Sequence, residues 1–268
     1  MTSKSITREI RPVISGTNWQ GIWTLYTKEV HRYFKIFGQT LLAPIITAIL
    51  FLTVFGIVFG ENRTVGKLSY IEFLAPGLLM MTILQNAFAN TSTSIISQKI
   101  NESIVDTLMP PLSPLELTIG FILGGATRGL MVALGVGLSL SIVVPISLHN
   151  PGAIILFSVS AAVMMGSMGL MTGIWAKKFD HVSTVTNFII LPLSFLSGTF
   201  FPINRFPDLL QVASHYNPFF YLIDGLRFGF TNQSTGSITT GVFLVIIINI
   251  LLWSTCYWML RVGYKIKD

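Results

Sequence analysis

Charged residues are scarce in this sequence, and their scarcity excludes two large classes of protein. Asp, Glu, Lys and Arg make up 10% of the 268 residues, whereas hydrophobic residues make up 51%. A soluble globular chain carries about 25% charged residues, and a disordered chain combines low hydrophobicity with high charge. Neither description fits, so the chain is expected to be an integral membrane protein.

Cysteine is nearly absent as well, and no grouping of reactive side chains stands out. Because Cys256 is alone, no internal disulfide can form. Residues 60–67 do not form a phosphate-binding loop, since five residues instead of four separate the two glycines. The four histidines lie in separate segments without metal-ligand spacing: His31, His149, His181 and His215. The sequence predicts no catalytic residue, metal site or cofactor, and no enzyme. If ATP drives this protein, a partner chain must bind ATP and Mg²⁺.

Long uncharged runs are what the sequence has in abundance. A helix needs about 20 apolar residues to cross the hydrocarbon core, because every backbone polar group must be satisfied internally. Six segments meet this requirement: 38–59, 73–95, 117–144, 153–175, 182–200 and 240–260. The apolar stretch 209–223 is too short to span and contains Asn217 and Pro218. The predicted fold is an all-α integral membrane protein with six transmembrane helices.

The segment before the first span has a different character. Residues 1–18 resemble a polar tail, whereas aromatic and aliphatic residues recur every three or four positions over 19–37. Lys28, Glu29, Arg32 and Lys35 lie mostly on the opposite side. Such a pattern is typical of an amphipathic helix that lies in the membrane interface against lipids. The alternative is a first span that extends into water, and the two forms can be continuous.

The distribution of cations predicts the orientation in the membrane. With both termini inside, most of the 17 Lys and Arg residues lie on the cytoplasmic side. Only Arg63, Lys67, Arg205 and Arg227 then lie outside. Cytoplasmic segments carry an excess of Lys and Arg, so both termini, including the tail 263–268, are expected in the cytoplasm. Scattered cations of this kind also argue against a nucleic-acid partner.

Three polar residues inside the predicted spans are candidates for a transport pathway. Arg128 lies about 11 residues into the third span, and Asn86 and Asn90 lie in the second. A central arginine costs about 2.5–3.5 kcal/mol or more unless it faces protein or a water-filled cavity. The alternative for Arg128 is satisfaction by carbonyls and hydroxyls of the second span. For the asparagines it is hydrogen bonding to neighbouring helices. Small-residue steps such as Gly120 and Gly124 indicate close helix packing.

Two motifs carry a resemblance to a known family. The first is residues 97–114, SQKINESIVDTLMPPLSP, between the second and third spans. The second is residues 191–202, LPLSFLSGTFFP, followed by Phe206-Pro207, Asn217-Pro218 and residues 224–227, DGLR. With the six-span pattern, the chain is identified as a member of the ABC-2 type transporter permeases over residues 19–262. It is similar to bacterial single-domain permeases, including those grouped with drug and lipo-oligosaccharide exporters.

The resemblance implies a function, partners and a location. Such a chain forms the export pathway of an ABC transporter in the bacterial inner membrane, with a second permease copy and a separate ATPase subunit. Cargo in this family is usually amphiphilic: drug-like, lipid-linked or saccharide-containing. The segment 98–108 corresponds to the cytoplasmic coupling helix. In such a helix Glu102 and Asp106 share one face, and the apolar residues that would press into the ATPase are Ile100, Ile104 and Leu108.

The resemblance also implies an external re-entrant segment between the fifth and sixth spans, over residues 201–235. Asp208 and Asp224 are expected to pair there with Arg205 and Arg227. This segment would cap the pathway and open during transport, or it would be a static plug. The residues assigned to it are Ser197, Gly198, Pro202, Asn217, Pro218, Asp224 and Arg227.

Two other classes of membrane protein are the alternatives. An ion-coupled secondary transporter normally carries acidic residues near the bilayer midplane, whereas every Asp and Glu here falls in a loop or at a span end. An integral membrane enzyme needs convergent His, Asp or Ser side chains, and the histidines are dispersed.

Overall fold

Helices form nearly all of the computed structural model, which describes residues 16–59, 64–144 and 147–265. Most of the expected tail 1–18 and the last three residues lie outside these ranges. Five of the described helices are long and apolar enough to cross a membrane. They are α2 (Phe37–Phe59), α3 (Tyr70–Ile100), α5 (Pro114–Leu140), α6 (Pro151–Trp175) and α11 (Ile238–Val262). The all-α membrane class is confirmed.

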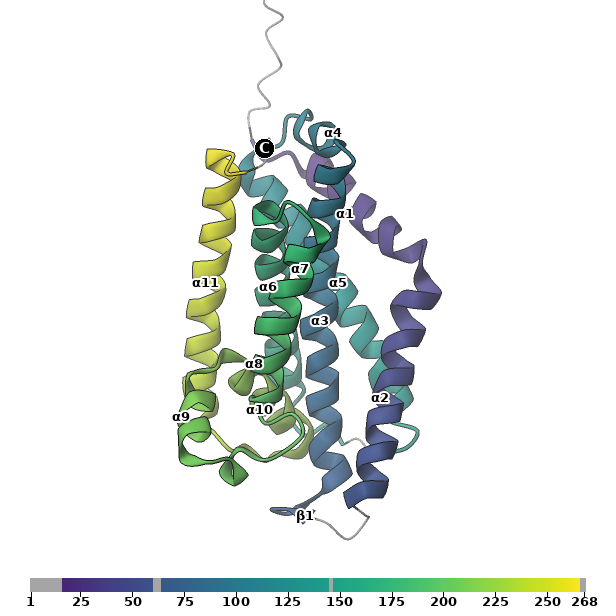
Figure 1. Cartoon of the computed structure of the whole chain (residues 1–268), viewed down its shortest axis with the longest axis vertical. Helices are drawn as coiled ribbons and strands as arrows, with labels where there is room; N and C mark the ends of the chain where they lie inside the picture. Colours follow the sequence, from purple (N-terminus) through teal and green to yellow (C-terminus); the bar gives the residue numbers. More distant parts are fainter. Residues whose placement is uncertain (1–15, 60–63, 145–146, 266–268) are drawn as a thin grey trace, which may run out of the picture.

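The sixth expected span, 182–200, is not one regular helix. The chain forms α7 (Phe179–Val185), a π-helical turn over Thr186–Ile190 and α8 (Leu191–Phe195). The wide turn is closed by the Leu191 N–H, which donates to the Thr186 carbonyl five residues earlier. These pieces succeed one another beside α6 and lead toward the end of the bundle that holds α9 and α10 (Figure 1). The structure therefore has five unbroken spanning candidates and one interrupted helix.

The starts of two central helices are set by local sequence. Before α3, the short antiparallel strands β1 (Thr64–Val65) and β2 (Leu68–Ser69) form a hairpin. The Ser69 hydroxyl then caps α3 by accepting a hydrogen bond from the Glu72 N–H, and the Glu72 carboxylate accepts one from the Ser69 N–H. Ser113 and Glu116 form the same capping box at the start of α5. These caps satisfy backbone N–H groups that a helix leaves free at its first turn.

The N-terminal amphipathic segment forms a helix of its own. Helix α1 covers Trp19–Phe34, and a turn at Lys35 and Ile36 separates it from α2. The first span therefore does not simply extend along the direction of α1, which lies at an angle to α2 (Figure 1). Helix α1 begins at the same end of the bundle as the short helix α4 (Ile104–Leu108), where α11 also ends.

Helix α3 is the centre of the bundle. In its most apolar stretch 78% of the residues are buried, against 11% in α2 and 11% in α11. Glycines let neighbouring helices approach it closely. A Cβ on Gly169 of α6 would lie 2.5 Å from the Phe88 carbonyl of α3. Helices α5 and α1 also approach closely, since a Cβ on Gly124 of α5 would lie 2.6 Å from Glu29 Cβ of α1. The expectation that the glycine steps mark close helix packing is confirmed.

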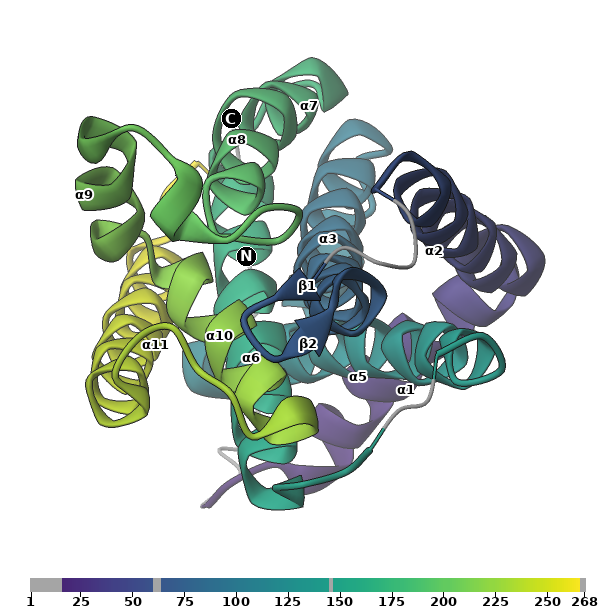
Figure 2. The same ribbon diagram turned by 90° about the horizontal axis from the view of Figure 1, so that it is seen from below.

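The opposite end of the bundle is formed by short elements. After α8 come a 3₁₀ turn (Ile203–Arg205), α9 (Asp208–Tyr216) and α10 (Pro218–Thr231). Neither α9 nor α10 belongs to the candidate spans among the described residues. Viewed from that end, α9 and α10 lie in front of α6 and α11, and the β1–β2 hairpin lies above α3 (Figure 2).

Candidate functional site

The loop between α3 and α5 differs from the single helix expected over 98–108. Helix α3 continues to Ile100, the chain turns through Glu102 with a positive φ of 56°, and α4 covers only Ile104–Leu108. Since Glu102 lies in the turn, it does not share a helical face with Asp106. The predicted shared face of Glu102 and Asp106 is wrong. The predicted helix pattern ran through three residues, Asn101 to Ser103, that form a turn instead.

The turn also changes which apolar side chains are exposed. Ile104 and Leu108 pack against the chain's own core cluster, whereas Ile100, Val105 and Met109 are 47%, 51% and 69% exposed. Glu102 and Asp106 are exposed beside them. The accessible α4 surface therefore consists of Ile100, Glu102, Val105, Asp106 and Met109. Val105 and Met109 were missed by the sequence analysis because the assumed helical period placed them on the wrong face.

Hydrogen bonds connect α4 to the interior of the bundle. Thr107 of α4 is buried and donates to Gln98 Oε1 at 2.5 Å. Gln98 Nε2 donates in turn to Ser94 Oγ at 3.0 Å, one turn further along α3. Lys28 of α1 donates to Thr107 Oγ1 at 2.8 Å. The three helices α1, α3 and α4 are thus joined by polar side chains.

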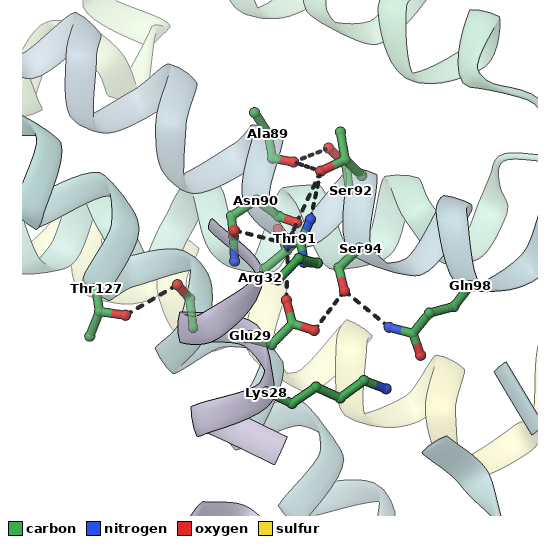
Figure 3. A network of polar contacts seen from close by, with 12 residues as sticks. Lys28, Glu29, Arg32, Ala89, Asn90, Thr91, Ser92, Ser94, Gln98 and Thr127 are labelled. Atoms are coloured by element: carbon green, nitrogen blue, oxygen red, sulfur yellow. Dashed lines mark hydrogen bonds and ion pairs between the residues drawn. The ribbon is translucent and has the colours of Figure 1, made fainter. Parts of the chain in front are cut away.

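The network continues to a fully buried carboxylate on α1. Ser94 donates to Glu29 Oε1 at 2.6 Å, and Arg32 lies 3.0 Å from Glu29 Oε2. Arg32 also donates to the Asn90 carbonyl at 2.7 Å and to Asn90 Oδ1 at 2.9 Å. A buried carboxylate must be paired and hydrogen-bonded, and here both oxygens have partners. We call the chain Thr107–Gln98–Ser94–Glu29–Arg32–Asn90 the polar network. Figure 3 shows its part from Gln98 to Asn90.

Glu29 was not a predicted site residue, because the amphipathic pattern placed it on the polar side of α1. It is 0% exposed, and Asn90 is buried to the same degree. The buried face of α1 consists of Ile22, Leu25, Glu29 and Tyr33, at steps of three and four residues. Glu29 interrupts this otherwise apolar stripe, and a carboxylate in that position was the signal that could have indicated a buried polar contact.

A cavity of about 540 Å³ lies beside the middle of the bundle. Its walls come from α2, α3 and the π-helical segment, and Arg128 of α5 reaches it. Asn86 lines it as well, although its Nδ2 donates to the Thr82 carbonyl of its own helix. Of the three predicted pathway residues, the structure therefore brings Asn86 and Arg128 to the cavity and places Asn90 in the polar network.

Arg128 has no partner in the described part of the chain. No hydrogen bond or ion pair reaches its guanidinium, and its Nε is buried without an acceptor. The alternative from the sequence, satisfaction by carbonyls and hydroxyls of the second span, is not what the structure shows. The hydroxyls of Thr91, Ser92 and Thr93 donate to carbonyls of α3 itself.

The predicted re-entrant residues form a tightly bonded cluster around Arg227. Arg227 Nη2 donates to the Gly198 carbonyl at 2.8 Å, and Nε donates to the Phe73 carbonyl at 3.3 Å. Its Cζ lies 3.9 Å from the centre of the Phe73 ring, and Nη1 lies 3.9 Å from Asp224 Oδ1. Asp224 also accepts from two backbone N–H groups. The expected Asp224–Arg227 pair is present, whereas no ion pair joins the described residues Arg205 and Asp208.

The other predicted residues in this region hold the turn between α8 and α10. Asn217 Nδ2 donates to the Leu193 carbonyl at 2.7 Å and to Ser197 Oγ at 3.2 Å. Gly198 has a φ of +73°, which glycine adopts without strain. Pro218 is the first residue of α10, where its missing N–H costs nothing, and Pro202 precedes the 3₁₀ turn.

Comparison with known proteins covers most of the chain. The family described as ABC-2 type transporter matches residues 20–231. The inner membrane transport permease YadH of Escherichia coli K12 is 32% identical over 253 residues, which cover 93% of this chain and 98% of that protein. Nodulation protein J of Rhizobium leguminosarum bv. viciae is 22% identical over 250 residues, covering 90% and 93% of the two chains. Nodulation protein J of Rhizobium meliloti is 24% identical over 230 residues, covering 80% and 81%.

Proposed function

The chain belongs to the ABC-2 type transporter family, and we propose that it is the membrane-spanning permease subunit of an ABC exporter whose ATPase is a separate polypeptide. The α4 surface is the proposed docking site for that ATPase. Exposed carboxylates beside exposed apolar side chains suit a basic groove on a soluble protein. Cargo would be an amphiphile of the drug-like, lipid-linked or saccharide-containing kind.

The observation that carries this proposal is the polar network, because it runs from the docking helix to Asn90, one helical turn from the cavity wall. Thr107 lies in the docking helix itself, and Asn90 lies one helical turn from Asn86, which lines the cavity. A displacement of α4 must therefore break or move hydrogen bonds that end beside the pathway. Coupling of this kind needs two arrangements of one contiguous network, whose populations ATP binding would bias.

The location and orientation follow from the same assignment. If α4 meets a cytoplasmic ATPase, the bundle end that holds α4 and the start of α1 lies in the cytoplasm. The described chain ends lie at that end (Figure 1), which supports the orientation derived from the cations. The relative YadH is an inner membrane permease, and we place this chain in the bacterial inner membrane.

A second copy of the chain would complete the pathway. Helix α2 leaves most of its apolar surface uncovered, with only 11% of its central stretch buried. The same helix forms one wall of the cavity. A symmetric partner that packs along α2 would turn two half-cavities into one enclosed passage, as a closed two-fold assembly requires.

An ion-coupled secondary transporter is the competing function, and Glu29 bears on it directly. It is a buried acidic residue, which the sequence had placed on a polar face. Both of its oxygens are engaged, one by Ser94 and one by Arg32. A carboxylate held in this way has no free site for a coupling ion, so its arrangement favours a structural link over a proton relay.

The test uses the permease together with the ABC ATPase that co-purifies with it. The purified pair is reconstituted in liposomes for the ATP hydrolysis measurements. Asp106→Lys should reduce both co-purification and permease-dependent ATP hydrolysis, because it places a cation in the docking surface. Thr107→Val should keep co-purification yet lower the hydrolysis that depends on the permease. Asp208→Lys, an exposed carboxylate at the opposite end, is the matched control and should change neither quantity. Unchanged hydrolysis in Asp106→Lys and Thr107→Val would exclude the proposed coupling route.

A further inference from the structure

Three of the buried polar atoms without partners lie close together, and one of them belongs to Arg128, which lines the cavity. Four buried side-chain atoms lack a hydrogen-bond partner among the described residues: Arg32 Nε, Asn90 Nδ2, Arg128 Nε and Asn249 Oδ1. The three nitrogens belong to one neighbourhood. Arg32 bonds to Asn90, and Asn90 Nδ2 would lie 3.8 Å from a Cβ on Gly124, one turn before Arg128 on α5. All three are donors, so the missing partner is an acceptor.

The charges in this neighbourhood do not balance. The ionisable neighbours of Arg128 are Arg32, which carries the same sign, and Tyr33, whose phenol is uncharged at neutral pH. Glu29 is the carboxylate at hand, and it is engaged by Arg32 and Ser94. One positive charge therefore remains uncompensated at the cavity wall. Arg128 is partly buried, with its Nε covered, and a cation at this depth of a membrane protein without a counter-charge is a candidate ligand site.

A second copy of the chain packed along α2 would not supply the missing anion. Helix α2 contains no Asp or Glu, and the interrupted helix of residues 179–195 contains only Asp180, in its first turn. Helix α3 contains only Glu72, also in its first turn. A symmetric copy seated on this face would thus bring apolar and uncharged side chains to the depth of Arg128, which lies about half-way along α5.

From these observations we infer that Arg128 binds the anionic group of an amphiphile that occupies the cavity. A phosphate or carboxylate matches the guanidinium fork and accepts the surplus hydrogen bonds. The rest of the ligand would lie against apolar wall residues such as Phe51, Met81 and Ile190. A volume of about 540 Å³ lies within the usual range for sites that hold drug-sized molecules. This inference rests on the proposed function and names the charge of its cargo.

The test measures binding to the permease alone, in phosphatidylcholine nanodiscs, so that it does not depend on ATPase coupling. Dodecyl phosphate and dodecylphosphocholine are the probes, because they share a chain and differ in net charge. The wild type should bind dodecyl phosphate about tenfold more tightly or better, the effect of one charge-assisted hydrogen bond. Arg128→Gln should lose this preference and Arg128→Lys should keep part of it. Arg205→Gln, an exposed arginine at the other end, should keep it fully.

Two further measurements identify the source of the anion and the alternative to it. In the first measurement, phosphatidylglycerol is added to the nanodisc. The site belongs to a membrane lipid if phosphatidylglycerol displaces dodecyl phosphate and if native mass spectrometry detects that lipid on the wild type but not on Arg128→Gln. Absence of competition assigns it to exported cargo, and both results support the anion site. Equal binding of the two probes by the wild type overturns the inference. A preference for dodecyl phosphate that persists in Arg128→Gln also overturns it. Dissociation of a dimer by Arg128→Gln overturns it as well, because the counter-charge would then lie on a second copy.

Discussion

Two arginines lie on helices of the same bundle in opposite electrostatic surroundings. Arg227 on α10 has a carboxylate at 3.9 Å, two carbonyl acceptors and an aromatic ring beneath its guanidinium. Arg128 on α5 has none of these among the described residues and faces a cavity. Arg227 has its hydrogen-bond and ion-pair partners within the protein, whereas Arg128 has none among the described residues. Only the partners distinguish them, since both are single cations in apolar sequence.

The comparison predicts the largest effect at Arg227. Arg227→Leu removes the cation but leaves Asp224 buried and the Gly198 and Phe73 carbonyls without a donor. Removing one member of a buried pair typically costs about 3–5 kcal/mol. We expect a loss of unfolding free energy of that order, measured by denaturation of the purified protein in a single detergent. Arg205→Leu, at an exposed position nearby, should be close to wild type. Equal stability of Arg227→Leu and wild type would show that this cluster is not structural.

A smaller effect is expected from Glu29, the carboxylate of the polar network. Glu29→Ala leaves Ser94 without its acceptor and removes the counter-charge of Arg32, which keeps its hydrogen bonds to Asn90. An unsatisfied buried group costs about 1–3 kcal/mol, and the partial exposure of Arg32 favours the lower half of that range. The same denaturation measurement tests it, with the exposed Asp180→Ala as control. Glu29→Gln, which keeps a carbonyl acceptor, should recover part of the loss.

The smallest effect on stability is expected at Arg128 itself. Arg128→Leu removes no hydrogen bond and relieves an uncompensated charge, so the same denaturation measurement should show no loss of unfolding free energy. The two arginine-to-leucine variants should therefore differ by several kcal/mol in their loss of unfolding free energy. A loss at Arg128 as large as the loss at Arg227 would mean that this arginine has structural partners in the assembled protein.

Much of the fold could be predicted because long apolar runs have few alternatives in a bilayer. Helices occupy five of the expected segments, and their ends coincide with caps such as Ser69 and Ser113. Hydropathy did not reveal which helices are central. Helix α3 is the most buried candidate span although it carries Asn, Thr and Ser side chains. In lipid, polar residues face other helices, so the most apolar run is the one that the protein leaves uncovered.

The site was predictable only where one residue carried the signal. Arg128 stood out because a lone cation in a span is expensive, and the structure brings it to the cavity. Glu29 did not, since its burial depends on Gly124 of a helix about 90 residues away and on Ser94. The turn through Glu102 was also missed, because its positive φ replaces a helical turn in a sequence whose apolar spacing continues regularly. Long-range packing and local strain leave little trace in periodicity.

The wide turn at Thr186–Ile190 has a consequence for the evolution of this wall. Val182 and Ile190 are both buried, yet eight residues of a regular α-helix would place them about 80° apart around its axis. One surplus residue in the turn reduces the effective interval to seven, which brings them within about 20° of each other. A lineage that deleted that residue could straighten the helix and keep both inward contacts. What would change is the set of side chains presented to the cavity, so a single-codon deletion could alter the cavity wall without repacking the interior.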